Sequence, residues 1–125
     1  MRKLVVIMTF LGLSLSGFAQ DKNAKASIEV DGVCMMCKFR IEKAAVKSKG
    51  VKSANWNMET HILDLIFDER KTDLTTIKTN IAAVGHDTKD IKATIEAYES
   101  VDDCCRYRDE QIVKDHQNGK KKGGH

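Results

Sequence analysis

The apolar residues between Ala26 and Gly85 change their spacing in an order that few folds can accommodate. Apolar and polar residues alternate over 26–30, which predicts a half-buried strand, and Asp31-Gly32 then interrupts it. From Cys37 to Ser48 the apolar residues recur at helical spacing, and a glycine at position 50 can adopt the left-handed conformation that ends a helix. We therefore expect a strand followed directly by a helix.

Two further strands and a second helix are expected downstream. The ranges 51–58 and 62–67 each place alternate apolar residues on one face, with Glu59-Thr60-His61 as the turn of a hairpin between them. Thr72 or Asp73 can cap the following helix. The apolar stripe of this helix consists of Leu74, Ile77, Ile81 and Val84, and Gly85 ends it.

The order strand, helix, strand, strand, helix supplies the first five elements of a ferredoxin-like βαββαβ sandwich, which is an α+β fold. The fourth strand would have to come from 88–93, although few residues in this range are apolar. We therefore predict that residues 20–93 form a four-stranded antiparallel sheet with both helices on one face.

A C-terminal extension, residues 94–117, is expected to follow the sandwich and contains the adjacent pair Cys104-Cys105. Three apolar residues at three-residue spacing predict a short third helix that leads to this pair: Ile95, Tyr98 and Val101. Residues 118–125 combine lysines with glycines, which predicts a flexible basic tail.

The N-terminus has the layout of a secretory signal peptide, residues 1–19. Arg2 and Lys3 precede an apolar run over 4–15, and Ala19 is the small residue after which cleavage is expected. The apolar run is too short to span a hydrocarbon core of about 30 Å as a helix, and no second such run follows. We therefore expect a periplasmic or secreted protein with no membrane span after cleavage of the signal peptide.

Size and charge narrow the classes of function. Residues 20–125 suffice for one domain with a modest core. The chain carries 21 Lys and Arg against 18 Asp and Glu, and the predicted signal peptide contains two of the basic residues. The charges of the remaining chain nearly balance, so nucleic acid is not an expected partner. A small binding module without catalysis is the expectation.

Cys34 and Cys37 are spaced so that both sulfurs can reach one ion, because Cys34 precedes the first turn of the predicted helix and Cys37 lies within it. The free N–H groups and positive dipole end of a helix N-terminus stabilise thiolate over thiol. Thiolates are soft ligands that select Cu(I), Zn(II) or other thiophilic ions over Mg(II) and Ca(II). The pair therefore predicts a soft-metal site, with Cu(I) favoured.

Several segments within about 26–93 share the pattern of one known family: Val30-Asp31-Gly32-Val33-Cys34-Met35-Met36-Cys37, Ile41-Glu42-Lys43-Ala44, Gly50-Val51, Met58-Glu59-Thr60, and Ile81 to Gly85-His86. In these segments the chain resembles the heavy-metal-associated domain family of copper chaperones and periplasmic mercury-binding proteins. The family usually has Gly-Met-Thr before its first Cys, whereas this chain has Asp31-Gly32-Val33 and lacks the buried Met of the usual loop.

The resemblance implies a metallochaperone or metal scavenger that binds Cu(I), with mercury(II), zinc(II) and cadmium(II) as alternatives. It places His86 beside the metal loop, either as a third ligand, as in cyanobacterial copper chaperones, or as a solvated loop residue. It also implies that the ion passes by stepwise exchange of sulfur ligands to an acidic-surfaced exporter or acceptor domain. The helix that would dock this partner is basic through Lys38, Arg40, Lys43 and Lys47.

Cys104 and Cys105 lie outside the resemblance, and adjacent cysteines pair with each other only under strain. One reading has the extension fold back so that these sulfurs join the ion at Cys34, or hold a second ion. Additional thiolates would favour a polynuclear Cu(I) or four-sulfur Zn(II) site. The other reading is a redox-labile or intermolecular disulfide, and the residues alone leave both open.

Several alternatives remain at this stage. The methionines at positions 35 and 36 could offer thioether contacts to Cu(I), although an apolar lip that excludes water is the favoured reading. A thiol-disulfide redox protein could use Cys34 and Cys37, but the chain contains no Pro and so lacks the cis-Pro of thioredoxin-like proteins. A metal-bridged homodimer and a purely structural exported domain are also open.

Overall fold

A computed structural model describes residues 20–122, with backbone alone for 119–122. The predicted signal peptide and the last three residues, including His125, lie outside the described residues. The elements in chain order are β1 (Ala24–Glu29), α1 (Met35–Lys47), β2 (Val51–Trp56), β3 (Ile62–Phe67), α2 (Leu74–Ala83), α3 (Ile95–Glu99), the 3-10 turn η1 (Asp103–Cys105) and α4 (Glu110–Lys122).

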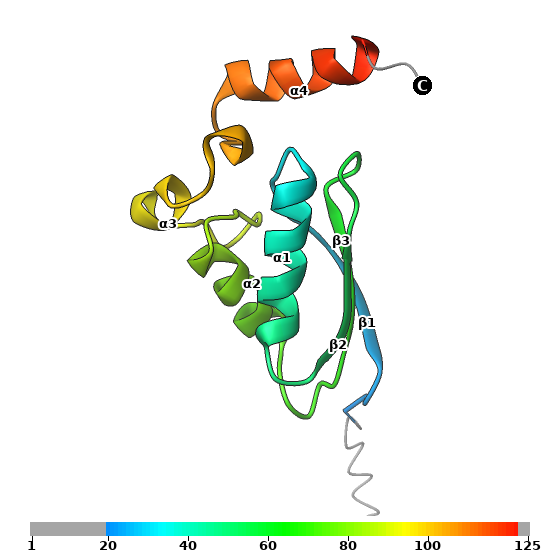
Figure 1. Ribbon diagram of the computed structural model, residues 1–125. Helices are drawn as coiled ribbons and strands as arrows, with labels where there is room; N and C mark the ends of the chain where they lie inside the picture. Colours follow the sequence, from blue (N-terminus) through cyan, green and yellow to red (C-terminus); the bar gives the residue numbers. More distant parts are fainter. Residues whose placement is uncertain (1–19, 123–125) are drawn as a thin grey trace, which may run out of the picture.

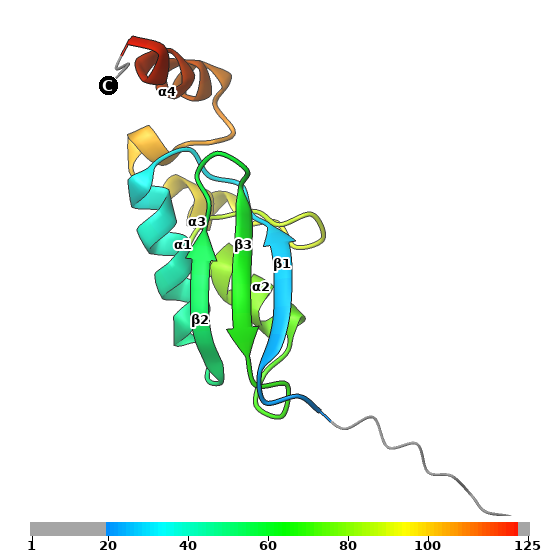
Figure 2. The ribbon, with the colours of Figure 1, turned by 90° about the vertical axis from the view of Figure 1, so that its right-hand side faces the viewer.

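The described sheet is antiparallel and has the strand order β1-β3-β2. Strands β2 and β3 form the predicted hairpin, in which Trp56 lies opposite Leu63. Helices α1 and α2 cover one face of the sheet, as Figures 1 and 2 show. The α+β order that the apolar spacing predicted is thus confirmed through α2.

The core lies between the sheet and the two helices and contains the residues that the periodicity placed there. Asp73 is the N-cap of α2 and accepts a hydrogen bond from the backbone N–H of Thr76, as one of the two predicted caps. Fully buried members of the core include Ile41 and Ala45 from α1, Trp56, Leu63 and Leu65 from the hairpin, and Ile77 and Ile81 from α2.

The predicted fourth strand is wrong. Among residues 20–122 the sheet has three strands, and the segment 88–93 contributes one isolated antiparallel bridge, between Val30 and Thr88. The physical reason is local: the Thr88 N–H donates to the carbonyl of Ile91 at 2.9 Å, and the Thr88 hydroxyl bonds the same turn. This turn satisfies the backbone groups that a strand beside β1 would have used.

The chain after this turn packs back onto the domain. The predicted third helix forms as α3, with Thr94 as its N-cap, and Val101 and Cys105 are buried in the core. Gly85 allows the close approach, because its φ is +101° and a Cβ there would lie 2.6 Å from the carbonyl oxygen of Ala97. The extension is therefore a packed part of the structure.

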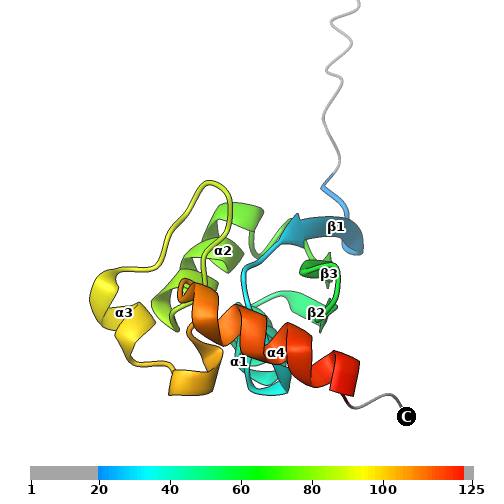
Figure 3. The same ribbon diagram turned by 90° about the horizontal axis from the view of Figure 1, so that it is seen from above.

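Helix α4 lies across the end of the domain at which α1 begins (Figures 1 and 3). It continues to Lys122, into the range 118–125 for which the sequence predicted a flexible tail. Within residues 20–122, no helix is both long enough and apolar enough to cross a membrane.

Candidate metal centre

The first two cysteines lie where the sequence predicted. Cys34 has extended backbone and is the N-cap of α1, whereas Cys37 lies in the first turn and is fully buried. Their Sγ atoms are 3.4 Å apart. The loop-to-helix transition therefore brings both sulfurs to one point at the helix N-terminus.

The loop that carries Cys34 is fixed from two sides. The Trp56 indole N–H donates a hydrogen bond of 3.0 Å to the carbonyl of Val30, and its ring packs so close to Gly32 that a Cβ there would lie 3.0 Å away. On the other side, Nδ1 of His86 lies 2.8 Å from the carbonyl oxygen of Asp31. These buried contacts hold the position of Cys34 without the methionine of the usual family loop.

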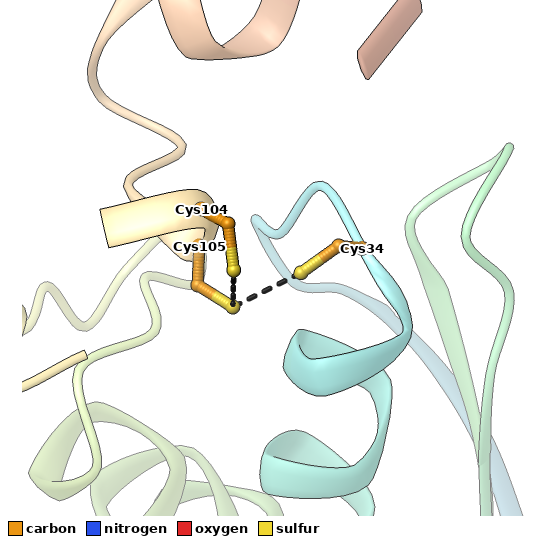
Figure 4. A group of neighbouring side chains, drawn as sticks. All are labelled: Cys34, Cys104 and Cys105. Carbon is orange, nitrogen blue, oxygen red and sulfur yellow. Dashed lines mark hydrogen bonds between the residues drawn. The ribbon is translucent and has the colours of Figure 1, made fainter. Parts of the chain in front are cut away.

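The C-terminal cysteines reach the same point from η1. The Sγ of Cys105 lies 3.0 Å from that of Cys34 and 3.9 Å from that of its neighbour Cys104 (Figure 4). The sulfurs of Cys34, Cys104 and Cys105 all lie within 4.8 Å of one another and form a group able to hold a metal ion. All four cysteines are free thiols in the structure. The predicted return of the extension towards Cys34 is thus present.

The thiols differ in how readily they ionise. Burial raises the pKa of Cys34, but hydrogen bonds from the Cys105 thiol and the backbone N–H of Cys37 outweigh it, so the pKa is lowered. Burial dominates at Cys37 and Cys105 and raises the pKa of both thiols. Cys34 is therefore the thiol of the three that ionises most readily, and a soft ion bound among them would have to displace protons from Cys37 and Cys105.

Arg40, on α1, is turned towards this group. Its guanidinium lies 3.2 Å from a carboxylate oxygen of Asp102 and 3.4 Å from Nε2 of His86. Burial lowers the pKa of Arg40, but a hydrogen bond to Cys105 and the nearby Cys37 outweigh this, so the pKa is raised. Arg40 thus places a positive charge beside the sulfurs, where thiolates would accumulate negative charge.

His86 does not join the sulfur group. The side chain is fully buried, and both ring nitrogens already lie against protein groups, Asp31 and Arg40. Burial is the main reason that its pKa is lowered to about 4, so the imidazole is neutral at pH 7. A direct role of His86 in metal binding stays a prediction, whereas its structural role is to hold the metal loop.

The structure describes two further histidines, which were not predicted as metal ligands. His61 stacks on Trp56 in the hairpin turn, with a centroid distance of 5.5 Å. Nε2 of His116, on α4, lies 2.8 Å from the carbonyl oxygen of Cys104 and so helps to fix η1. Of the two methionines beside the site, Met36 has its Sδ 3.6 Å from the Sγ of Cys104.

The basic face predicted on α1 is smaller than its sequence suggests. Nζ of Lys38 forms an ion pair with Glu42 at 2.6 Å and donates a hydrogen bond to the carbonyl of Trp56 at 2.8 Å. Arg40 faces the sulfurs. Lys43 and Lys47 stay exposed. Exposed apolar side chains share this helix, namely Met35, Met36, Phe39 and Val46.

The residues that anchor the extension were missed by the sequence analysis. The Tyr107 hydroxyl donates to the carbonyl of Gly85 at 2.6 Å and accepts from the N–H of Asp87 at 3.0 Å, while its ring stacks on His86. Arg108 forms an ion pair with Asp87 at 2.8 Å. No periodicity or motif marks these residues, because their partners lie about twenty positions away in the chain.

Comparison with known proteins finds relatives that are named for copper. A segment is 30% identical over 84 residues to a "Probable copper-exporting P-type ATPase" of Archaeoglobus fulgidus, covering 66% of this chain and 10% of that protein. The chain thus spans about a tenth of the ATPase. Among solved structures, a CopZ metallochaperone is 29% identical with a TM-score of 0.51, covering 52% of this chain and 98% of that one.

A second solved structure is the N-terminal domain of a potential copper-translocating P-type ATPase from Bacillus subtilis in its Cu(I)-loaded state. It is 25% identical with a TM-score of 0.51, and the match covers 54% of this chain and 85% of that domain. Residues 27–87 match the family described as the heavy-metal-associated domain. This part of the chain, which carries Cys34, Cys37 and His86, therefore belongs to the heavy-metal-associated domain family.

Proposed function

We propose that this chain is an exported Cu(I)-binding protein that acts as a chaperone or scavenger and carries out no catalysis. One observation carries the proposal: the Sγ of Cys34 lies 3.4 Å from that of Cys37 and 3.0 Å from that of Cys105. Three thiols at one helix N-terminus form a soft donor set with a low coordination number, which suits Cu(I). Relatives named for copper support the same choice of metal.

In this proposal Cys34 and Cys37 form the base of the site and Cys105 covers it. Cys34 is half-buried, whereas Cys37 and Cys105 are fully buried, so an ion bound among them is shielded from water. The third sulfur comes from the chain itself. An acceptor must displace Cys105 before it can take the ion by ligand exchange, so the extension favours retention of copper over rapid transfer.

Export rests on the signal-peptide layout of residues 1–19. The acceptor that we propose is an acidic-surfaced exporter or metal-binding domain. It would dock on the exposed part of α1, where Lys43 and Lys47 lie beside the apolar side chains of Met36 and Phe39.

Competition with a Cu(I) chelator tests the metal assignment on reduced chain under anaerobic conditions. The wild type should withhold one tightly bound Cu(I), and the Cys34→Ser, Cys37→Ser variant should lose it to the chelator. Circular dichroism of both proteins controls for folding, because Cys37 is buried. Equal competition by the two folded proteins would show that these cysteines do not bind the metal.

The same preparation separates copper binding from the redox alternative. A thiol-disulfide protein that does not hold copper would cycle its cysteines with a redox partner at the same rate with or without added Cu(I). Our proposal predicts that bound Cu(I) blocks alkylation of Cys34 by iodoacetamide and is released intact by the chelator.

A further inference from the structure

Five sulfur atoms follow one another from the core to the surface, and we call them the sulfur strip. The Sγ atoms of Cys37 and Cys34 are 3.4 Å apart, and those of Cys34 and Cys105 are 3.0 Å apart. The Sγ of Cys104 lies 3.9 Å from that of Cys105, and the Sδ of Met36 completes the strip 3.6 Å from Cys104. The copper site proposed above uses the inner sulfurs of this strip, which are those of Cys37, Cys34 and Cys105.

We propose that the outer part of the sulfur strip binds a second Cu(I), held by Cys104 and Cys105 with the Met36 thioether beside them. Cys34 and Cys105 lie between the two ions and bridge them. This inference rests on the proposed Cu(I) function of the inner sulfurs and adds a second ion, two further ligands and a route for the metal.

The shape of the sulfur strip favours two Cu(I) over one tetrahedral ion. A four-sulfur Zn(II) site needs its ligands at about 2.3 Å from the metal and all roughly 3.8 Å from one another. Here the group whose sulfurs all lie within 4.8 Å consists of Cys34, Cys104 and Cys105, and Cys37 is outside it. Cys34 contacts Cys37 and Cys105, and Cys105 contacts Cys34 and Cys104, so these two central sulfurs are placed to bridge an inner and an outer ion.

The two ends of the sulfur strip differ in exposure. Cys37, at the inner end, is fully buried, whereas Cys104 and Met36, at the outer end, are exposed, Met36 to 47%. A neutral thioether is a weaker donor than a thiolate but still selects soft ions. The outer ion is therefore the accessible, weakly held one, and each neighbouring sulfur can take it inward by ligand exchange.

The surroundings suit the charge of such a cluster. Four thiolates and two Cu(I) ions carry two net negative charges, and Arg40 and the N-terminus of α1 oppose them with positive charge. His116 holds the carbonyl of Cys104 from α4 at 2.8 Å, so the outer ligand sits on a fixed turn.

Native mass spectrometry of the reduced, anaerobic full chain, titrated with Cu(I) alone, tests the inference. We expect two Cu(I) per wild-type chain and one in Cys104→Ser, whose side chain is exposed and can change without disturbing the core. Met36→Leu should keep both ions but weaken the second roughly tenfold. Met35→Leu, at an equally exposed position, is the matched control and should behave as wild type.

One Cu(I) in the wild type, or two in Cys104→Ser, would overturn the outer site and leave the proposed function intact. Equal weakening of the second ion by Met35→Leu and Met36→Leu would overturn the role of Met36. Absence of any bound Cu(I) in the wild type would instead overturn the proposed function.

Discussion

The metal loop and the C-terminal extension bring two cysteines each to one cluster, but by different physical means. Cys34 and Cys37 are three positions apart, so the start of one helix places both sulfurs. Cys34 and Cys105 are 71 positions apart, and their sulfurs meet only because the extension packs against α2 and the metal loop. We therefore expect the loop to determine whether metal binds and the extension to determine how firmly the metal is held.

The contrast also follows the boundary of the family match. Residues 27–87 contain the loop and both helices that support it, whereas Cys104 and Cys105 follow this range. A site on the matched part alone would have two sulfurs and an open side. In this chain the extension closes that side with its own thiol.

Loss of the loop cysteines should have the largest effect. Cys34→Ser with Cys37→Ser removes two thiolates from the ion, and we expect Cu(I) affinity to fall more than about 100-fold, because loss of outer-shell partners alone costs roughly 10–100-fold. Chelator competition measures this. A fall of less than about tenfold would mean that the extension, and not the loop, holds the metal.

Removal of the extension thiol should weaken retention to a smaller degree. We expect Cys105→Ala to release Cu(I) to a chelator about 10–100-fold faster while the loop still binds the ion. Stopped-flow transfer kinetics at a fixed chelator concentration measures the rate. Equal release rates for Cys105→Ala and wild type would place Cys105 outside the coordination sphere.

His86 links the two regions, because its Nδ1 holds the metal loop and its ring stacks on Tyr107 of the extension. Its pKa is about 4 in the folded protein, against a reference of 6.5. The unfolded chain therefore binds the proton first as the pH falls, and the folded state loses stability between pH 6.5 and 4.

At pH 5 this loss amounts to about 2 kcal/mol relative to pH 7, since each pKa unit corresponds to about 1.4 kcal/mol. Urea unfolding at both pH values measures it. We expect His86→Gln to be less stable at pH 7 but to lose less stability on acidification. An unchanged pH dependence in His86→Gln would contradict the buried neutral imidazole.

The anchor of the extension should give the smallest effect. Tyr107→Phe removes the hydroxyl that joins Gly85 and Asp87, leaving a buried carbonyl and N–H without this partner, so we expect a loss of about 1–2 kcal/mol. Hydrogen exchange should show faster opening of residues 94–117 in Tyr107→Phe; opening of the whole domain instead would mean that the extension is not a separate unit.

The sequence predicted the local part of this structure but only one feature of the long-range part, the return of Cys104-Cys105 towards Cys34. Alternating and helical spacing located β1, both hairpin strands and α2, and the spacing of Cys34 and Cys37 located the start of α1. These features depend on neighbours within a few residues. The fourth strand failed because Thr88 and Ile91 close a turn that periodicity alone does not reveal.

In the candidate site, the sequence predicted the sulfur ligands but not the side chains that surround them. Its thiols could be named from the sequence, since soft sulfur ligands are few and come in pairs. The burial of His86 and the inward turn of Arg40 could not, because both follow from how Tyr107 and Asp102 pack in the extension. Charge patterning placed Arg40 on a solvated docking face, whereas it faces the sulfurs.

X-ray absorption at the copper edge, on chain loaded with one Cu(I), tests most directly whether the extension supplies a ligand. We predict three sulfur neighbours in the wild type and two in a Cys104→Ser, Cys105→Ser variant. Identical spectra with two sulfurs in both proteins would contradict the account and leave copper on Cys34 and Cys37 alone.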